Sequence, residues 1–155
     1  MKQRINDITK GGNALKAMYG LGAYLASCSL EKPRLDLVYF RVSQVNGCAY
    51  CLAMHSKDLR AEGSNEQRLY GISAWREAPY YSDRERAALA WAESVTMVTE
   101  GHVPDEVFEM ACTQFSEEEL IDLTLAVNTI NDYNRFNIAF RTPAGSYVPG
   151  QHAVK

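Results

Sequence analysis

Residues 116–140 read SEEELIDLTLAVNTINDYNRFNIAF, and this stretch decides the fold class. It opens with a capping box, in which the Ser116 and Glu119 side chains each pair with the backbone N–H of the other residue. Apolar residues then recur three or four positions apart on one face: Leu120, Leu123, Val127 and Ile130. This spacing predicts one long amphipathic helix over residues 116–140.

Other helix starts are marked by the same kinds of signal. They are capping boxes or a proline near the first turn: Ser64 with Gln67, Ser82 with Glu85, Pro33, and Pro104. Gly63 and Gly101 stand where glycines commonly end helices. No segment alternates apolar and polar residues for long enough to predict a strand. The sequence therefore predicts an all-α fold.

Composition and charge exclude several classes of protein. The 155 residues are 46% hydrophobic and 23% charged, which is typical of one globular domain. We expect a helical N-terminal segment at 1–32, a core at 33–140 and a Pro- and Gly-rich tail at 141–155. The net charge of −3 and the dispersed lysines and arginines argue against a nucleic-acid partner.

The sequence also lacks the signals of a membrane protein. No apolar run reaches the length of about 18 residues that a membrane span needs. Residues 14–30 are interrupted by lysine and glycine, which favours an amphipathic helix over a signal peptide. We therefore expect no membrane association and a cytoplasmic protein.

A second stretch bears on function: NGCAYCLAMHS, residues 46–56. Asn46 is a good N-cap residue, so Cys48 and Cys51 are expected in the first turn of a helix. The N-terminus of a helix stabilises a thiolate through its free N–H groups and its dipole. The spacing places His55 on the same face, one turn after Cys51. The pattern is that of a thiol pair with a base beside it.

Other interpretations of the two cysteines are weaker. A structural zinc site needs four ligands, but the remaining cysteines and histidines are scattered: Cys28, Cys112, His102 and His152. Haem attachment requires a histidine directly after the second cysteine, where this chain has Leu52. Cys48 and Cys51 could also be small hydrophobic core residues, as we expect for Cys28 and Cys112. A redox pair without a metal or cofactor is the favoured hypothesis.

On these residues the chain resembles the AhpD-like alkylhydroperoxidases of the carboxymuconolactone decarboxylase superfamily. The specific stretch is LDLVYFRVSQVNGCAYCLAMHSKDLRAEG, residues 35–63, and looser similarity continues through QRLYGISAWREAPYYSDRERAALAWAE and LTLAVNTINDYNRFNIAFR. The family pattern is an acid twelve residues before a Cys-x-x-Cys pair, with a histidine four residues after the second cysteine. The matching residues are Asp36, Cys48, Cys51 and His55.

The resemblance implies roles for these residues. The peroxide oxidises Cys51, Cys48 then forms a disulfide with it, and His55 and Asp36 act as a proton relay. The family acid is usually Glu, one methylene longer, so we expect Asp36 to reach His55 either directly or through a water. Tyr50 stands where the best-known members carry a histidine and is a candidate auxiliary residue. The resemblance also implies a helical fold and homo-oligomers, often trimers or hexamers.

The sequence thus predicts a thiol peroxidase or disulfide oxidoreductase that reduces alkyl hydroperoxides. Such an enzyme needs no bound cofactor, but it needs an external dithiol or a redox protein as reductant. Two alternatives remain open: a decarboxylase-type enzyme acting on a small cyclic acid, and an oligomeric scaffold that senses redox state. The apolar residues of 116–140 and the nine tyrosines favour a homo-oligomer in each case.

Overall fold

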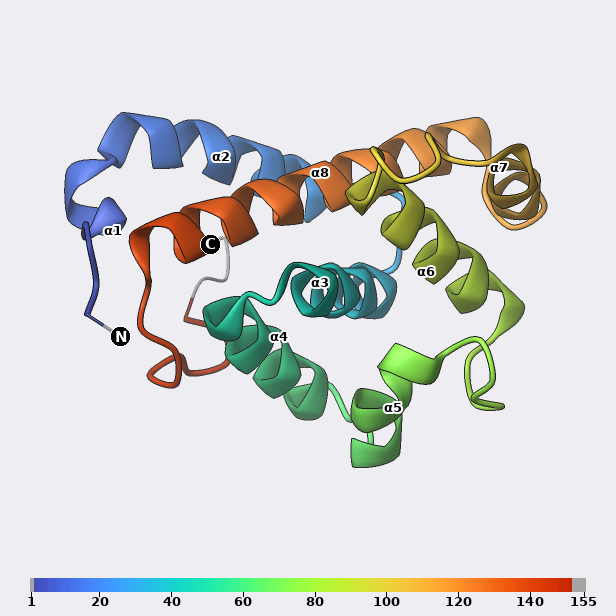
Figure 1. The fold of residues 1–155 in the computed structure, drawn as a ribbon, viewed down its shortest axis with the longest axis horizontal. Helices are drawn as coiled ribbons and strands as arrows, with labels where there is room; N and C mark the ends of the chain where they lie inside the picture. The colour runs from blue at the N-terminus through green and yellow to red at the C-terminus, as the bar shows by residue number, and fades with distance from the viewer. Residues whose placement is uncertain (1, 152–155) are drawn as a thin grey trace.

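The computed structural model describes residues 2–151, and all regular structure in that range is helical (Figure 1). The elements are α1 (Asp7–Lys10), α2 (Gly12–Leu25), α3 (Lys32–Asn46), α4 (Ala49–Ala61), α5 (Glu66–Gly71), the 3-10 helix η1 (Ile72–Ala74), α6 (Asp83–Thr96), α7 (Asp105–Cys112) and α8 (Glu117–Phe140). The all-α prediction is confirmed. The end of the expected tail, which includes His152, lies outside the described residues.

Helix α8 is the longest element and crosses the whole molecule in Figure 1. It contacts α2, α3, α4, α6 and α7. The apolar stripe predicted from the sequence is buried in the main core: Leu120, Leu123, Val127 and Ile130. Within residues 2–151, no helix is both long and apolar enough to cross a bilayer.

Helix α3 lies in the middle of the fold, seen nearly end-on in Figure 1 and packed against α4, α6 and α8. Val38 and Val42 on this helix are completely buried in the main core. The opposite side of α3 packs into a second core with α4, η1 and α6, in which Trp75 is buried. Trp91 is buried in the main core, so both tryptophans are core residues.

Most of the predicted helix starts are observed. The capping boxes of Ser82 and Ser116 form with both of their hydrogen bonds, and Pro33 lies in the first turn of α3. The box predicted at Ser64 is wrong, because the neighbouring Asn65 caps α5 and accepts a hydrogen bond from the Arg68 N–H at 2.9 Å. Pro104 is the N-cap of α7 rather than a first-turn residue.

The two predicted glycine stops differ in outcome. Gly63 has φ +91° and directly follows the C-cap of α4, where a residue with positive φ ends the helix. Gly101 also has a positive φ, +116°, but α6 already ends at Thr96, because the chain enters a series of turns before this glycine.

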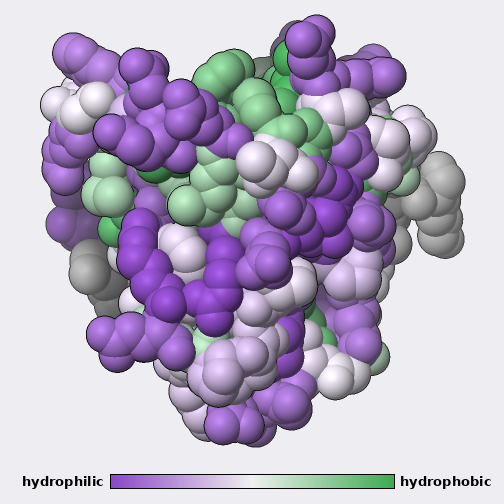
Figure 2. Space-filling view, turned by 90° about the vertical axis from the view of Figure 1, so that its right-hand side faces the viewer, coloured by the Kyte–Doolittle hydropathy of each residue, from purple (hydrophilic) through white to green (hydrophobic). Residues whose placement is uncertain are grey.

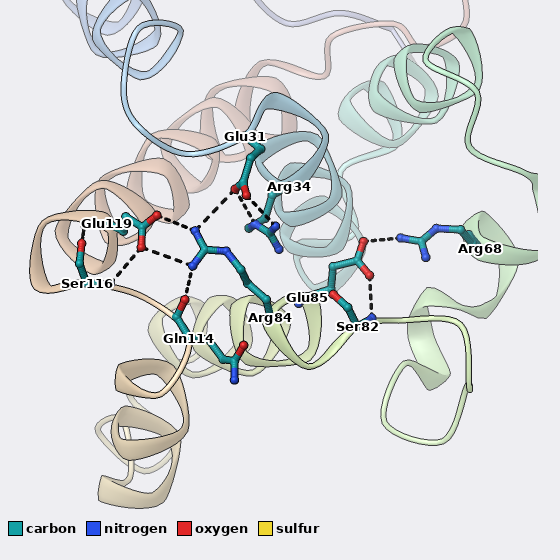
Figure 3. Close-up of polar contacts among 9 residues, drawn as sticks. All are labelled: Glu31, Arg34, Arg68, Ser82, Arg84, Glu85, Gln114, Ser116 and Glu119. Atoms are coloured by element: carbon teal, nitrogen blue, oxygen red, sulfur yellow. Dashed lines mark hydrogen bonds and ion pairs between the residues drawn. The ribbon is translucent and has the colours of Figure 1, made fainter.

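An ion-pair cluster joins the starts of α3, α6 and α8 (Figure 3). Arg84 of α6 contacts Glu119 at 2.6 Å and Glu31 at 3.6 Å. The Arg84 guanidinium also lies over the Phe115 ring, 4.3 Å from its centroid. A second pair in the same view joins Arg68 to Glu85, which also completes the Ser82 capping box. These contacts stabilise the N-terminal end of α3. Cys48 and Cys51 follow the opposite end of this helix.

Candidate functional site

The cysteine pair lies at a sharp turn between α3 and α4. Gly47 has φ +68° and ψ +30°, the left-handed conformation that ends α3. Cys48 then acts as the N-cap of α4, and its Sγ accepts a hydrogen bond from the Cys51 N–H at 3.4 Å. The prediction that Asn46 caps this helix is wrong, because α3 continues through Asn46 and only ends at the glycine. The prediction that the pair lies at the start of a helix is confirmed, with Cys48 as the N-cap and Cys51 in the first turn.

The two thiols are buried and share a hydrogen bond. The hydrogen bond from the Cys51 thiol lowers the pKa of Cys48, and the backbone N–H groups of Cys51 and Tyr50 act in the same direction against the effect of burial. The same hydrogen bond, together with burial, raises the pKa of Cys51. Consequently, the first proton that the pair loses leaves the negative charge on Cys48.

Side chains from α8 face Cys51. The Asn137 amide donates to Cys51 Sγ at 3.5 Å and to the Tyr133 carbonyl at 2.8 Å. Hydrogen bonds from Asn134 and Asn137 lower the pKa of Cys51, although they do not outweigh Cys48 and burial. These asparagines are therefore placed to stabilise a charge on the second cysteine.

A buried amide network holds the turn against α8. The Asn46 amide donates to Asn131 Oδ1 at 2.8 Å and to Asn134 Oδ1 at 2.9 Å. Asn134 in turn donates to Ser43 Oγ at 3.1 Å. This network was not predicted from the sequence. Its signal is an asparagine at every third position of α8: Asn128, Asn131, Asn134 and Asn137. All but Asn128 point into the fold.

His55 lies one turn after Cys51 and is only 6% exposed. Neither of its ring nitrogens has a hydrogen-bond partner within residues 2–151, and its ring packs at a tilt against Tyr39, with 5.5 Å between centroids. Burial, reinforced by the positive charge of Lys32, lowers the pKa of His55 to about 3. The imidazole is therefore neutral at physiological pH.

Asp36 is buried on α3, but its carboxylate is held by Lys32 at 2.6 Å, four residues earlier on the same helix. Lys32 also pairs with Glu62 after α4. Burial raises the pKa of Asp36 to about 6, with Lys32 opposing and Glu62 adding to the shift. No hydrogen bond joins Asp36 to His55 among the described residues. The expected contact between acid and histidine is thus replaced by an ion pair in this conformation.

Tyr50 borders a cavity of about 430 Å³ next to the pair. Cys48 also lines this cavity, as do Asn137 and Arg141 from the end of α8. Burial, followed by the charge on Cys51, raises the pKa of Tyr50. The cavity gives the reactive turn a space that a small molecule could occupy.

The remaining cysteines lie elsewhere. Cys28 is half-buried, and Cys112 is exposed at the end of α7, so the expectation that both are buried is wrong. Cys112 is the last residue of the short helix α7, on a side of it that faces solvent. His102 is exposed in a loop. In the part of the chain that the structure describes, no three His, Cys, Asp or Glu side chains gather as a metal-ligand set.

Residues 12–94, which include the cysteine turn, match the model of the carboxymuconolactone decarboxylase family. The chain belongs to this family. YdfG, an uncharacterised protein of Bacillus subtilis (strain 168), is 38% identical to it over 94% of this chain and 99% of its own length. YdfG thus matches this family member over nearly its full extent.

Solved structures show the same fold for this family member. A protein of unknown function from Agrobacterium tumefaciens, described as a candidate antioxidant defence protein AhpD, has a TM-score of 0.90 at 39% identity, covering 94% of this chain and 100% of its own. The debrominase Bmp8 has a TM-score of 0.79 at 22% identity, covering 89% of this chain and 74% of its own, a likeness that shows the fold alone. The fold is therefore AhpD-like.

The buried histidine of this family member should make stability depend on pH. Its folded pKa of about 3 lies below the unfolded value of about 6.5, so below pH 6.5 the unfolded chain binds a proton that the folded chain does not. Acidification from pH 7 to pH 5 should therefore cost about 2 kcal/mol through His55. His55→Leu should remove this loss, as measured by urea unfolding at both pH values.

Asp36 acts with the opposite sign, since its raised pKa of about 6 favours the folded state as pH falls from 6 towards 4. Asp36 is present in both wild type and His55→Leu, so its contribution cancels when the pH dependence of the two proteins is compared. His102→Asn, at an exposed loop position with φ +53°, is the matched control and should keep the wild-type pH dependence. An unchanged pH dependence in His55→Leu would contradict the assignment.

Proposed function

We propose that this protein is a thiol-dependent peroxidase or disulfide oxidoreductase that reduces organic hydroperoxides through Cys48 and Cys51. The observation that carries the proposal is the position of two buried thiols at a helix start, where Cys48 Sγ accepts the Cys51 N–H at 3.4 Å. The adjoining cavity and the likeness to an AhpD-type protein at 39% identity support it.

The proposed first step oxidises Cys51. Its proton passes along the shared hydrogen bond to Cys48, which moves the thiolate to Cys51, where Asn134 and Asn137 donate hydrogen bonds. The Cys51 thiolate then attacks the terminal oxygen of the hydroperoxide and breaks the O–O bond. The departing alkoxide takes up a proton, so that the products are an alcohol and a Cys51 sulfenic acid.

The second and third steps regenerate the pair. Cys48 attacks the sulfenic sulfur of Cys51, and water leaves as the disulfide forms. An external dithiol or redox protein then reduces the disulfide by thiol–disulfide exchange and is itself oxidised. The cycle transfers two electrons from the dithiol to the hydroperoxide, and we propose no bound cofactor.

We further propose that His55 and Asp36 form the proton relay. A neutral imidazole can accept the first proton that the cysteine pair loses and can later return it to the alkoxide, but a pKa of about 3 makes it a weak base. The relay therefore requires Asp36 to exchange its ion pair with Lys32 for His55, which would raise the pKa of the histidine. Lys32 thus controls access to the relay.

The two cysteines should behave differently when replaced. Cys51→Ser should abolish peroxide turnover, whereas Cys48→Ser should still undergo one oxidation and accumulate a sulfenic acid, because its resolving thiol is missing. Peroxide consumption with several dithiol reductants, combined with mass spectrometry of the dimedone adduct, measures both outcomes. Cys112→Ser, at an exposed position on α7, is the control and should retain turnover.

The reverse outcome, with the first oxidation lost only in Cys48→Ser, would assign attack to Cys48. Wild-type thiols that stay reduced after a stoichiometric hydroperoxide would favour the decarboxylase-type alternative, in which the cysteines are incidental. Stoichiometric oxidation to the disulfide without turnover by any dithiol would favour the redox-sensing oligomer.

Asn137 should control the reactivity of Cys51. In a Cys48→Ser background, Asn137→Ala removes a hydrogen bond to the thiolate and should raise the pKa of Cys51. Oxidation by a hydroperoxide at pH 7 should slow by about tenfold, the usual value of a hydrogen bond to a charged group. The thiolate absorbance at 240 nm reports the pKa. Asn128→Ala, exposed on the same helix, should match the background, and equal pKa values in all three proteins would refute the role.

We also propose that the protein forms a homo-oligomer, a trimer or hexamer. The face in Figure 2, the end of the molecule where α7 lies in Figure 1, shows apolar side chains among polar ones. Large exposed apolar residues of α7 and the first turns of α8 include Phe108, Met110 and Ile121. Sedimentation velocity at micromolar concentration should show a species several times the 17.4 kDa of the chain, and a monomer alone would contradict this.

A further inference from the structure

The cavity beside Cys48 has a composition suited to a particular class of substrate. Its walls are largely apolar, with Ala49 after the first cysteine, Ile138 on α8, and Pro143 and Ala144 after that helix. At about 430 Å³ it is within the range that holds a small organic molecule. It is therefore more than a channel for hydrogen peroxide.

One charged side chain borders this cavity, that of Arg141. This residue is the C-cap of α8, with φ +56° and ψ +51°, and its N–H donates to the Ile138 carbonyl at 3.3 Å. The backbone of Arg141 is thus held at the end of α8, and this holds the Arg141 Cα beside the cavity.

The Arg141 guanidinium makes no ion pair with a carboxylate in residues 2–151. In contrast, six other arginines each pair with a glutamate, and Arg86 is held by backbone carbonyls; the six are Arg34, Arg41, Arg60, Arg68, Arg76 and Arg84. An unpaired guanidinium beside an apolar cavity is a good receptor for a carboxylate, because its planar N–H groups bind both oxygens.

The charges around the cavity mouth favour an anion. Arg4 donates to the Ala139 carbonyl at 3.1 Å and brings a second positive charge to the end of α8. The acidic groups near this region are already engaged: Asp58 accepts a hydrogen bond from Tyr147 at 2.8 Å, and Asp7 is buried. Asp7 also acts on Tyr50, so the tyrosine side of the cavity is the less favourable one for a carboxylate.

We infer that the cavity is the substrate site and that it selects organic hydroperoxides carrying a carboxylate, which Arg141 binds. This inference rests on the proposed peroxidase function for its chemistry. The apolar body of the substrate occupies the space against Ile138 and Pro143, and its hydroperoxide group faces the cysteine pair. The carboxylate is unchanged in the reaction, in which ROOH and two thiols give ROH, water and one disulfide.

A matched pair of substrates tests the inference. Cumene hydroperoxide and its 4-carboxylate derivative have the same reacting group and differ in the carboxylate at the opposite end of the ring. Wild type should favour the carboxylate by about fivefold in kcat/KM, a typical value for a solvent-exposed ion pair. In Arg141→Gln the ratio should fall to about one. Arg135→Gln, exposed on the same helix and outside the cavity, should keep the wild-type ratio.

A second measurement does not depend on peroxidase activity. Iodoacetate and iodoacetamide alkylate thiolates by the same reaction, but only iodoacetate is an anion. The ratio of their rates at Cys48, followed by mass spectrometry of the reduced protein, should fall about threefold in Arg141→Gln and stay unchanged in Arg135→Gln.

The two measurements separate the inference from the proposed function. If wild type consumes neither hydroperoxide but Arg141→Gln still shifts the alkylation ratio, the anion site stands and the peroxidase proposal fails. If wild type consumes both hydroperoxides equally and Arg141→Gln leaves the alkylation ratio unchanged, the inference is overturned while the peroxidase proposal survives.

Discussion

The hydrogen bonds between Asn46 and helix α8 are the constraint on which the site depends. Asn46 is the last residue of α3, and its amide reaches both Asn131 and Asn134. Buried amides are costly when unpaired, so the arrangement of the turn that pairs all three side chains is favoured. This arrangement fixes where Gly47 reverses the chain and therefore where α4 begins.

The position of α4 in turn sets the chemistry of the thiols. Because α4 begins at Cys48, this sulfur accepts the Cys51 N–H, and the Cys51 thiol faces the amides of α8. Burial opposes ionisation of both sulfurs, and the hydrogen bonds decide which of them carries the charge. A shift of one proton between the sulfurs would move the charge from Cys48 to Cys51, where Asn137 donates to the sulfur.

Helix α8 divides its two tasks along its length. Its first half is apolar towards the interior and forms the main core through residues such as Leu123 and Val127. Its second half replaces these side chains with asparagines and ends at Arg141, beside the cavity. One helix therefore supplies both the hydrophobic packing that holds α3 in the centre and the polar groups that surround the cysteines.

The sequence by itself determined the helical fold class and the place of the cysteine pair at a helix start. Capping boxes such as Ser116 with Glu119 and the apolar spacing of α8 are local signals, which act over a few residues and survive in any tertiary context. Tertiary structure alone decided the partners of the site residues. Asn137 reaches Cys51 across 86 positions of the chain, and Glu62, which follows another helix, reaches Lys32 across 30 positions. Such contacts depend on how whole helices pack, because burial and competing charges set the partner of each polar group, and no local pattern records them.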